Sequence, residues 1–404
     1  MQPLAVSARS VGGGGLQELR LLVVVSGDFG ELGAALNFLQ GLATSMPPAW
    51  SALVLLPTPL GHAMPIDCTQ PWRVYGTLAD IQRSLVEYRP NTVLLATGYL
   101  LTVDTGLTAL DVLRLLQRLR RLGVTLLTTD PFLGVRPWPT LPQVGDLRQP
   151  AGRLAFALSC YLIGLCSRVW AMRLALRKAW QVYPAPTARL PTLAGQRRLS
   201  YCSDHAAAAG TAPGAVLGDR PIWLFVLSRV DYALLVQAHG PDHLKALHPR
   251  LAECLALGRH AVVVGPAELV ADIESHFSDR DQLSVFSNLS HSRYLGWLMV
   301  AEYAFFWNLL SFSLIHRVLA GRPVFFFDPG HFATLFPAVA QAGQRLFYGG
   351  WRPPLRRLDQ PFDLQQLAHA AAATTQAFTN IGEGLRSGMT PAELLRIARS
   401  DGVG

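Results

Sequence analysis

Residues 311–330 read SFSLIHRVLAGRPVFFFDPG, and this stretch decides the fold class of the second half of the chain. The small hydroxyl residues Ser311 and Ser313 lead into a helical pattern that ends at Gly321. The run from Pro323 to Phe327 then predicts a strand without a polar residue. A strand that is apolar at every position is buried on both faces, which is typical of a parallel sheet covered by helices.

The same alternation of apolar strands and helical patterns runs through the chain in two series. Such an alternation predicts parallel sheets with helices on both faces. We therefore expect an α/β protein with two doubly wound, Rossmann-like domains that face each other across a cleft. The expected strands are 21–25, 51–56, 72–75, 92–96, 124–128 and 181–184 in the first series, and 222–227, 261–264, 283–286, 303–306 and 323–327 in the second.

The domain boundaries follow from length and composition. A chain of 404 residues is too long for one ordinary core. Proline, alanine and glycine accumulate between the two series, which is typical of a linker. We expect a disordered tail at 1–18, a first domain at 19–190, a linker at 191–219, a second domain at 220–350 and a C-terminal helical segment at 351–404.

The charge balance favours anionic ligands. Half of the residues are apolar and 15% are charged, so the chain can bury large sheets. The formal net charge is +8, and arginine supplies nearly all of it. Either a biased genome composition or attraction to phosphates, nucleotides or a lipid surface explains this excess. The arginines are spread along the chain and do not form a block with aromatics, so we expect no nucleic-acid binding.

The cysteines and the most apolar stretch of the sequence indicate where in the cell the protein is expected. The five cysteines form no C-x-x-C pair, so neither a disulfide framework nor a zinc site is indicated, and a cytoplasmic location is expected. The stretch 154–176 contains Arg168 and Arg173, which makes it a poor membrane span. A core helix with one basic edge is one interpretation. A helix that lies on the inner face of a membrane is the alternative.

The loop and helix around Ser311 could bind phosphate. Helix N-terminal amides together with the hydroxyls of Ser311 and Ser313 form a natural phosphate site, and N-capping is the other use of these serines. The pattern resembles the C-terminal domain of glycosyltransferases with the GT-B fold. In retaining members two glutamates bracket this loop and helix. Asn308 and His316 stand at those places here, which departs from the retaining mechanism.

This resemblance implies a role for each polar residue of the region. Ser311, Ser313, Asn308 and His316 would hold the phosphates of a nucleotide-sugar donor in the second domain. Arg229, directly after an expected strand, would neutralise the charge that the leaving nucleotide gains. A solvated arginine in a turn is the other interpretation. The first domain would then hold the acceptor.

A second glycine loop follows the first expected strand, with the sequence DFGELG at residues 28–33. Gly30 permits close approach of a ligand, and the spacing differs from that of a dinucleotide loop, so NAD binding is not supported. The loop resembles the acidic glycine loop that opens protein-arginine rhamnosyltransferases, and polysaccharide pyruvyltransferases open on a related pattern. The resemblance implies that Glu31 acts as the acceptor base, with Asp28 as its rival. Capping of the following helix is the alternative for both.

Three further candidates lie on loops. Asp130 follows the strand 124–128 and would face the cleft, because ligands of open α/β sheets bind beyond the carboxyl ends of strands. A simple turn would explain it equally. His62 could act as a base near the same edge, and His331 could touch the donor.

The sequence therefore predicts a glycosyltransferase that moves a sugar from a nucleotide-sugar to a glycan, lipid or protein acceptor. We expect an inverting, metal-independent reaction without a tightly bound cofactor, in which amides and arginine stabilise the leaving phosphate. A pyruvyltransferase or a nucleotide-sugar epimerase is the alternative on the same architecture. A non-catalytic binding protein is the alternative of a different class. The donor base, the sugar and the oligomeric state stay open.

Overall fold

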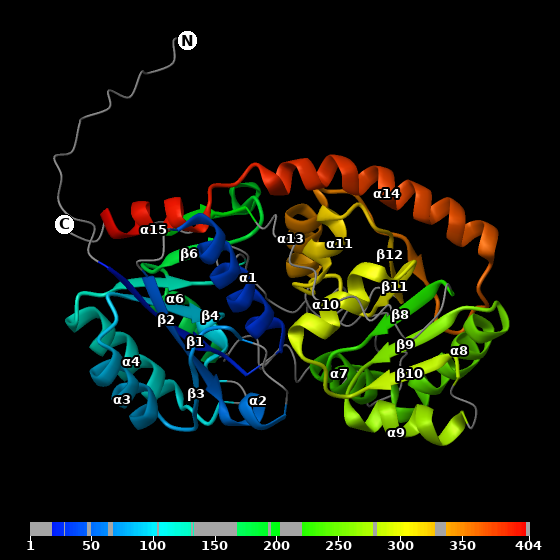
Figure 1. Cartoon of the computed structure of the whole chain (residues 1–404), viewed down its shortest axis with the longest axis horizontal. Coiled ribbons are helices and arrows are strands. Elements are labelled where there is room, and N and C mark those ends of the chain that lie inside the picture. The colour runs from blue at the N-terminus through cyan, green and yellow to red at the C-terminus, as the bar shows by residue number, and fades with distance from the viewer. Residues whose placement is uncertain are drawn as a thin grey trace, which may run out of the picture.

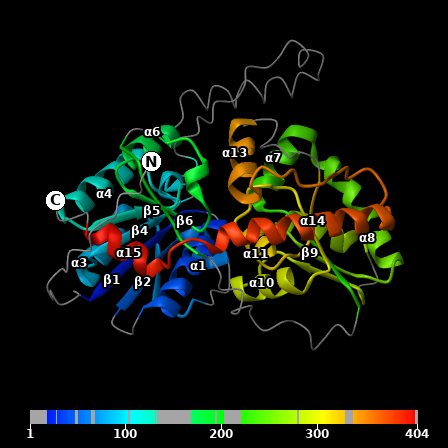
Figure 2. The same ribbon diagram turned by 90° about the horizontal axis from the view of Figure 1, so that it is seen from above.

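The computed structural model describes residues 18–27, 29–46, 50–63, 68–102, 105–130, 132, 168–192, 195–202, 220–277, 281–327 and 337–400. These residues form two parallel sheets that lie side by side (Figures 1 and 2). The first sheet has seven strands, in the order β3 (Trp72–Tyr75), β2 (Trp50–Pro57), β1 (Leu19–Val25), β4 (Thr92–Ala96), β5 (Thr125–Thr128), β6 (Trp180–Tyr183) and β7 (Arg197–Ser200). The second has six, in the order β10 (Leu283–Phe286), β9 (His260–Val264), β8 (Ile222–Val226), β11 (Tyr303–Phe306), β12 (Val324–Phe327) and β13 (Leu355–Arg356).

Helices follow the strands in both series, as the alternation predicts. In the first domain these are α1 (Phe29–Ser45), α2 (Thr58–Ala63), α3 (Leu78–Tyr88), α4 (Ala109–Arg121) and α6 (Arg168–Ala175), with 3-10 turns at Gly98–Leu100 and Thr187–Arg189. In the second they are α7 (Arg229–His239), α8 (Leu247–Ala256), α9 (Ala267–His276), α10 (His291–Val300), α11 (Leu314–Leu319) and α13 (Pro337–Tyr348), with a 3-10 turn at Pro241–Ala246. The chain closes with α14 (Leu364–Arg386) and α15 (Pro391–Ser400).

Strands in the middle of each sheet are buried on both faces, which is why their sequences are continuously apolar. All five residues of β4 are buried, and Val324 to Phe327 of β12 are buried as well. The strand order reverses between β1 and β4 and again between β8 and β11. In open α/β sheets such a reversal opens a crevice at the carboxyl ends of the strands, where ligands bind. The expected fold class, two doubly wound domains, is confirmed.

The C-terminal helices join the two domains. In Figure 1, α14 runs along the outside of the second domain, where it packs against α11, and the chain then crosses to the first domain. Leu394 and Leu395 of α15 are buried in the same core as α1 and β1. Thr390 and Glu393 form the expected capping box, since the Glu393 carboxylate accepts from the Thr390 amide at 2.8 Å and the Thr390 hydroxyl accepts from the Glu393 amide at 3.2 Å.

The structure differs from the sequence-based expectation in the first domain. Strand β6 is not the last of its sheet, because β7 pairs with it in parallel inside the stretch that predicted a linker. The sequence of β7, RRLS, is short and polar, so only its pairing reveals it. Of the expected helix that leads to Trp180, the described part is α6. No helix in the described ranges combines the length and hydropathy needed to cross a bilayer.

Candidate functional site

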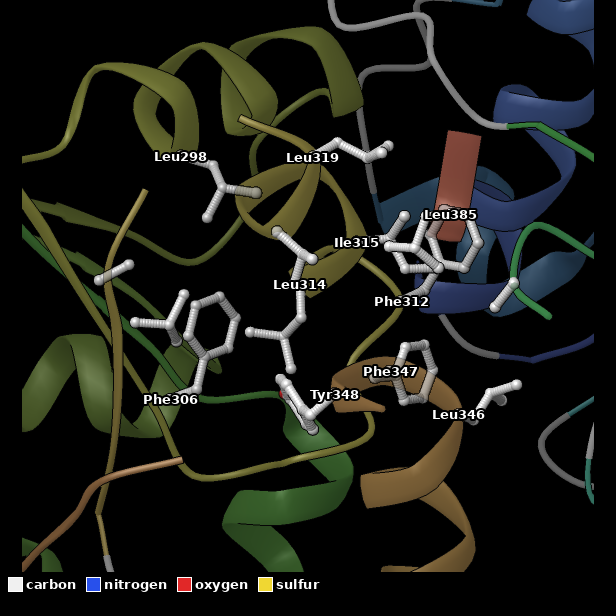
Figure 3. Packing of buried hydrophobic residues seen from close by; sticks show 14 of the residues in the cluster. Leu298, Phe306, Phe312, Leu314, Ile315, Leu319, Leu346, Phe347, Tyr348 and Leu385 are labelled. Atoms are coloured by element: carbon white, nitrogen blue, oxygen red, sulfur yellow. The ribbon is translucent and has the colours of Figure 1, made fainter. Parts of the chain in front are cut away.

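The two domains meet at the carboxyl ends of their strands. Phe312, in the loop after β11, packs its ring edge-on against Tyr183 at the end of β6, with centroids 6.3 Å apart. Phe347 of α13 also packs against Tyr183, with ring centroids 6.1 Å apart. In Figure 3, Phe312 and Phe347 lie on the side of the second-domain core that is nearest to the first domain. One buried apolar cluster therefore continues across the domain boundary.

The glycine loop of the first domain lies at the same boundary. A Cβ atom on Gly33 would lie 3.1 Å from Cε1 of His291 and 3.7 Å from Cδ1 of Phe312. His291 is the first residue of α10 in the second domain. Glycine at position 33 thus lets the first turn of α1 approach the second domain closely.

A chain of polar contacts lines the carboxyl edge of the second sheet. The Asn308 side-chain amide donates to Oδ1 of Asp231 at 3.4 Å, and its carbonyl accepts from the Leu310 amide at 2.8 Å. Asp231 in turn accepts from the Ser228 hydroxyl at 2.6 Å, and Ser228 caps α7. The loop after β11 is thereby tied to the helix after β8, its neighbour in the sheet. This tie lies at the point where the strand order reverses.

A chain of hydroxyl groups follows in the same loop. The Ser311 and Ser313 hydroxyl oxygens lie 2.9 Å apart, and the Tyr294 hydroxyl of α10 donates to Ser313 at 2.8 Å. Burial raises the pKa of Tyr294, so this phenol stays protonated and donates. Ser313 occupies the N-cap position of α11 without a side-chain capping bond. The Ser313 hydroxyl therefore does not cap α11.

The backbone amides of this turn are engaged. The amides of Leu314, Ile315 and His316 donate to the carbonyls three residues earlier, at 3.1 to 3.2 Å. These are 3-10 bonds that tighten the start of the helix. The expectation that these amides face a phosphate is therefore wrong, because they already have acceptors. What the loop offers to an anion is its hydroxyl groups.

Helix α11 is fixed from beneath by a buried arginine. Arg317 is fully buried, and its guanidinium donates to the carbonyls of Leu298 and Ala301 at 2.8 Å each. These carbonyls belong to the end of α10, so the cation fastens α11 to it. His316 is also buried, and its ring lies edge-on to Phe312 at 6.0 Å. The loop with Ser311 thus rests on a rigid support.

The predicted donor residue Arg229 begins α7 and its side chain is exposed. It follows the capping residue Ser228 and stands two positions before Asp231, at the same sheet edge as Asn308. The sequence SRVD at 228–231 carries the Ser-x-x-Asp signal of a helix start, which predicts α7 although the periodicity did not. Asp231 is the residue of this edge that the sequence analysis missed.

On the first domain, Glu31 lies in the first turn of α1 and is partly exposed. Burial raises the pKa of Tyr183, and the negative charge of Glu31 adds to that shift. Tyr99, at the end of β4, has its pKa raised by burial as well, again with a contribution from Glu31. The carboxylate of Glu31 therefore lies near enough to both tyrosines to raise their pKa values further. Gly30 is exposed, and Asp28 falls outside the described residues.

Asp130 lies in a buried ion pair at the end of β5. Its carboxylate lies 3.0 Å from Nε of Arg173 and accepts from Nη2 of the same residue at 3.2 Å and from the Phe132 amide at 3.1 Å. The guanidinium of Arg173 also lies 4.2 Å above the Tyr99 ring. Burial raises the pKa of Asp130, and Arg173 opposes that shift. Arg173, in the sequence only an interruption of an apolar stretch, is thus the partner of Asp130.

Two histidine candidates remain, His62 and His331. His62 lies in α2, near the carboxyl end of β2, and its side chain falls outside the described residues. His331 falls outside them entirely. Their roles stay predictions.

Comparison with known proteins bears on this arrangement. No protein-family model matches the sequence, and no curated protein matches it. Solved structures do match along almost the whole chain. The spinosyn rhamnosyltransferase SpnG superimposes with a TM-score of 0.52 at 14% identity, over 95% of this chain and 100% of that chain. The chain has the GT-B fold.

Two further matches show how widely this fold is used. The glycotransferase of kitacinnamycin gives a TM-score of 0.54 at 11% identity, over 95% of this chain and 98% of that one. A UDP-N-acetylglucosamine 2-epimerase from Listeria monocytogenes, itself named only by inference, gives 0.50 at 9% identity, over 94% and 95%. SpnG has also been solved with thymidine diphosphate, and that structure gives 0.51 at 14% identity over 94% and 100%. Structural matches at such low sequence identity establish the fold alone. The reaction has to be inferred from the residues of the site.

Proposed function

We propose that this GT-B chain transfers a glycosyl group from a nucleotide-sugar, held by the second domain, to an acceptor held by the first. The observation that carries the proposal is the hydroxyl and amide edge formed by Asn308, Ser311 and Ser313 at the reversal of the second sheet. It lies against the boundary with the first domain, because Phe312 belongs to the same loop and contacts Tyr183. A donor and an acceptor on either side of that boundary could react directly.

The donor side would act on the leaving group. When the bond between the sugar carbon and the phosphate oxygen breaks, negative charge grows on the departing nucleoside diphosphate. Ser311, the more exposed of the two serines, would accept from the Ser313 hydroxyl and donate to a phosphate oxygen, and the exposed Arg229 would supply positive charge. Asn308, fixed by Asp231, would hold the loop in place.

The acceptor side would supply the base. An inverting transfer forms a bond between the acceptor oxygen and the sugar carbon as the bond to phosphate breaks, and the acceptor proton goes to a carboxylate. Glu31 is the candidate base, because it lies in the first turn of α1 and its side chain is partly exposed. Asp130 is less suited, since both its oxygens are engaged by Arg173 and by the Phe132 amide. We assign it a structural role beneath Tyr99.

Nucleotide binding is tested by thermal unfolding with UDP, GDP, dTDP and CMP and their sugars. A ligand at a hundred times its dissociation constant stabilises the folded chain by about 2.7 kcal/mol. Ser311→Ala combined with Ser313→Ala should weaken this stabilisation. Ser275→Ala, which removes a hydroxyl on the outside of α9, is the matched control and should leave it unchanged. No stabilisation by any of these nucleotides would end the proposal.

A nucleotide-sugar epimerase is the second candidate, because the Listeria epimerase matches over 94% of this chain. The two reactions leave different products. An epimerase converts the nucleotide-sugar to an isomer of equal mass without an acceptor. A transferase releases the nucleoside diphosphate, by transfer or by slow hydrolysis. Incubation with the stabilising nucleotide-sugar, followed by NMR of the products, separates them, and Glu31→Gln should abolish release while it preserves binding.

A further inference from the structure

The outer face of the first domain carries leucines and arginines side by side. On α4, Leu113 is 44% exposed. Arg114 and Arg121 are exposed as well and lie nearly in line with each other beside the row of Leu113, since positions seven apart almost coincide around a helix. On α6 and the turn after it, Leu174 is 39% exposed and Arg177 and Lys178 are exposed. We call this set the α4–α6 patch: Leu113, Arg114, Arg121, Leu174, Arg177 and Lys178.

The two helices form one continuous surface. Nη2 of Arg120 donates to the Ala175 carbonyl at 2.8 Å, so the end of α4 is fastened to the end of α6. A shallow concavity of about 480 Å³ lies between them, lined by Arg120, Leu174, Ala175, Arg177 and Lys178. Figure 2 shows both helices on the same side of the first domain. The patch is thus a preformed surface with a basic hollow in it.

The positive charge of the patch is not balanced by carboxylates of the same segments. Residues 112–129 and 168–192 contain no aspartate and no glutamate. Nearby, Asp111 accepts from Thr108 at the start of α4, and Glu87 of α3 forms an ion pair with Arg73. An uncompensated basic surface attracts an anionic partner.

We propose that the α4–α6 patch docks the protein on an anionic lipid surface, with a lipid phosphate in the hollow and the leucines in contact with the acyl boundary. The exposed leucines favour a membrane over a nucleic acid, because phosphate backbones attract arginine but reward no aliphatic side chain. An amphipathic surface of leucines with flanking arginines and lysines suits the interface of a bilayer. The sequence that leads into α6 supports this choice, since residues 154–167 contain no charged residue.

Vesicle sedimentation of the full chain tests the proposal. The protein should bind vesicles of equimolar phosphatidylglycerol and phosphatidylcholine, release at high salt, and stay free of pure phosphatidylcholine. Arg121→Glu with Arg177→Glu should lower the partition coefficient by at least about thirtyfold. Each basic side chain at an anionic surface contributes about 1 kcal/mol, which is about fivefold.

The control separates the patch from net charge. Arg352→Glu with Arg396→Glu changes the net charge by the same amount at exposed positions outside the patch, and should leave binding within about twofold of the parent. Leu113→Gln should weaken binding, whereas Leu355→Gln, on a residue 49% exposed in the second domain, should not. Thermal unfolding of every variant should match the parent, since surface substitutions cost little.

Three results would overturn the proposal. One is equal binding to neutral and anionic vesicles, and another is equal loss in both charge-reversal pairs. The third is tight binding of a fluorescent DNA or RNA oligonucleotide that is lost in Arg121→Glu with Arg177→Glu while vesicles are not bound. That last outcome would assign the patch to nucleic acid.

Discussion

Phe312 and Tyr183 pack ring edge to ring face at 6.3 Å, with planes at 90°, and this contact joins the loop of one domain to a strand end of the other. Because Ser311 and Ser313 flank Phe312, the loop with the candidate phosphate-binding hydroxyls also contacts the first domain. Binding at those hydroxyls and the position of the domains are therefore expected to depend on each other.

Replacement of Phe312 measures the strength of the contact. Phe312→Ala removes a buried ring and should lower the free energy of unfolding by roughly 3 kcal/mol. Phe312→Leu keeps most of the volume and should cost roughly 1 kcal/mol. Denaturant unfolding followed by tryptophan fluorescence gives both values. If Phe312→Ala cost no more than Phe312→Leu, the ring would not carry the contact.

Two glycines of the same helix should respond differently to alanine. A Cβ on Gly30 would meet no atom within 4 Å, whereas one on Gly33 would meet His291 at 3.1 Å. Gly30→Ala should therefore stabilise the chain by up to about 1 kcal/mol, because alanine favours the helix. Gly33→Ala should lose that gain, since His291 has to move. Equal gains in the melting temperature for both would contradict the close approach of α1 to α10.

A charge exchange tests the tie between Asn308 and Asp231. Asn308→Asp places a carboxylate against a buried one and should destabilise the chain by roughly 1 to 3 kcal/mol. Asp231→Asn together with Asn308→Asp reverses the pair and should recover part of that loss. A double-mutant cycle on the free energies of unfolding gives the coupling. Additive effects would show that the 3.4 Å contact contributes nothing.

Removing one partner of the Asp130–Arg173 ion pair should lower the free energy of unfolding strongly, whereas replacing both partners by apolar residues should lower it much less. Asp130→Asn leaves a buried guanidinium without its counter-charge and should cost roughly 3 to 5 kcal/mol. Asp130→Leu with Arg173→Met removes both charges and should cost clearly less. Thermal unfolding separates the two. Should Asp130→Asn unfold like the parent but lose all turnover, the structural role assigned to Asp130 would be wrong, and a catalytic one would replace it.

Acid should weaken the cap at the start of the C-terminal helix. Hydrogen bonds from Thr390 lower the pKa of Glu393, so the folded state prefers the ionised form. The resulting stabilisation of α15 is present above the ordinary glutamate pKa and is lost as the pH falls through the lowered value. Glu393→Gln should abolish this part of the pH dependence. Thermal unfolding between neutral and acid pH compares the two curves, and parallel curves would contradict the prediction.

The α/β class and most strands follow from the sequence alone. Apolar runs such as Thr92 to Ala96 predict buried parallel strands, because a strand that is covered on both faces has no polar side to show. The capping box at Thr390 and the Ser-x-x-Asp start of α7 are equally local, since the interacting residues lie three positions apart. Ser311 and Ser313, directly before α11, are likewise visible in the sequence because they are close neighbours in the chain.

What only the tertiary structure decided involves partners distant in the chain. Strand β7 exists because β6 offers it a sheet edge, and its own four residues predict nothing. Arg173 pairs with Asp130 across 43 positions, and Asn308 reaches Asp231 across 77. Local sequence patterns locate the polar residues at the strand ends, and tertiary packing determines which of these residues contact each other.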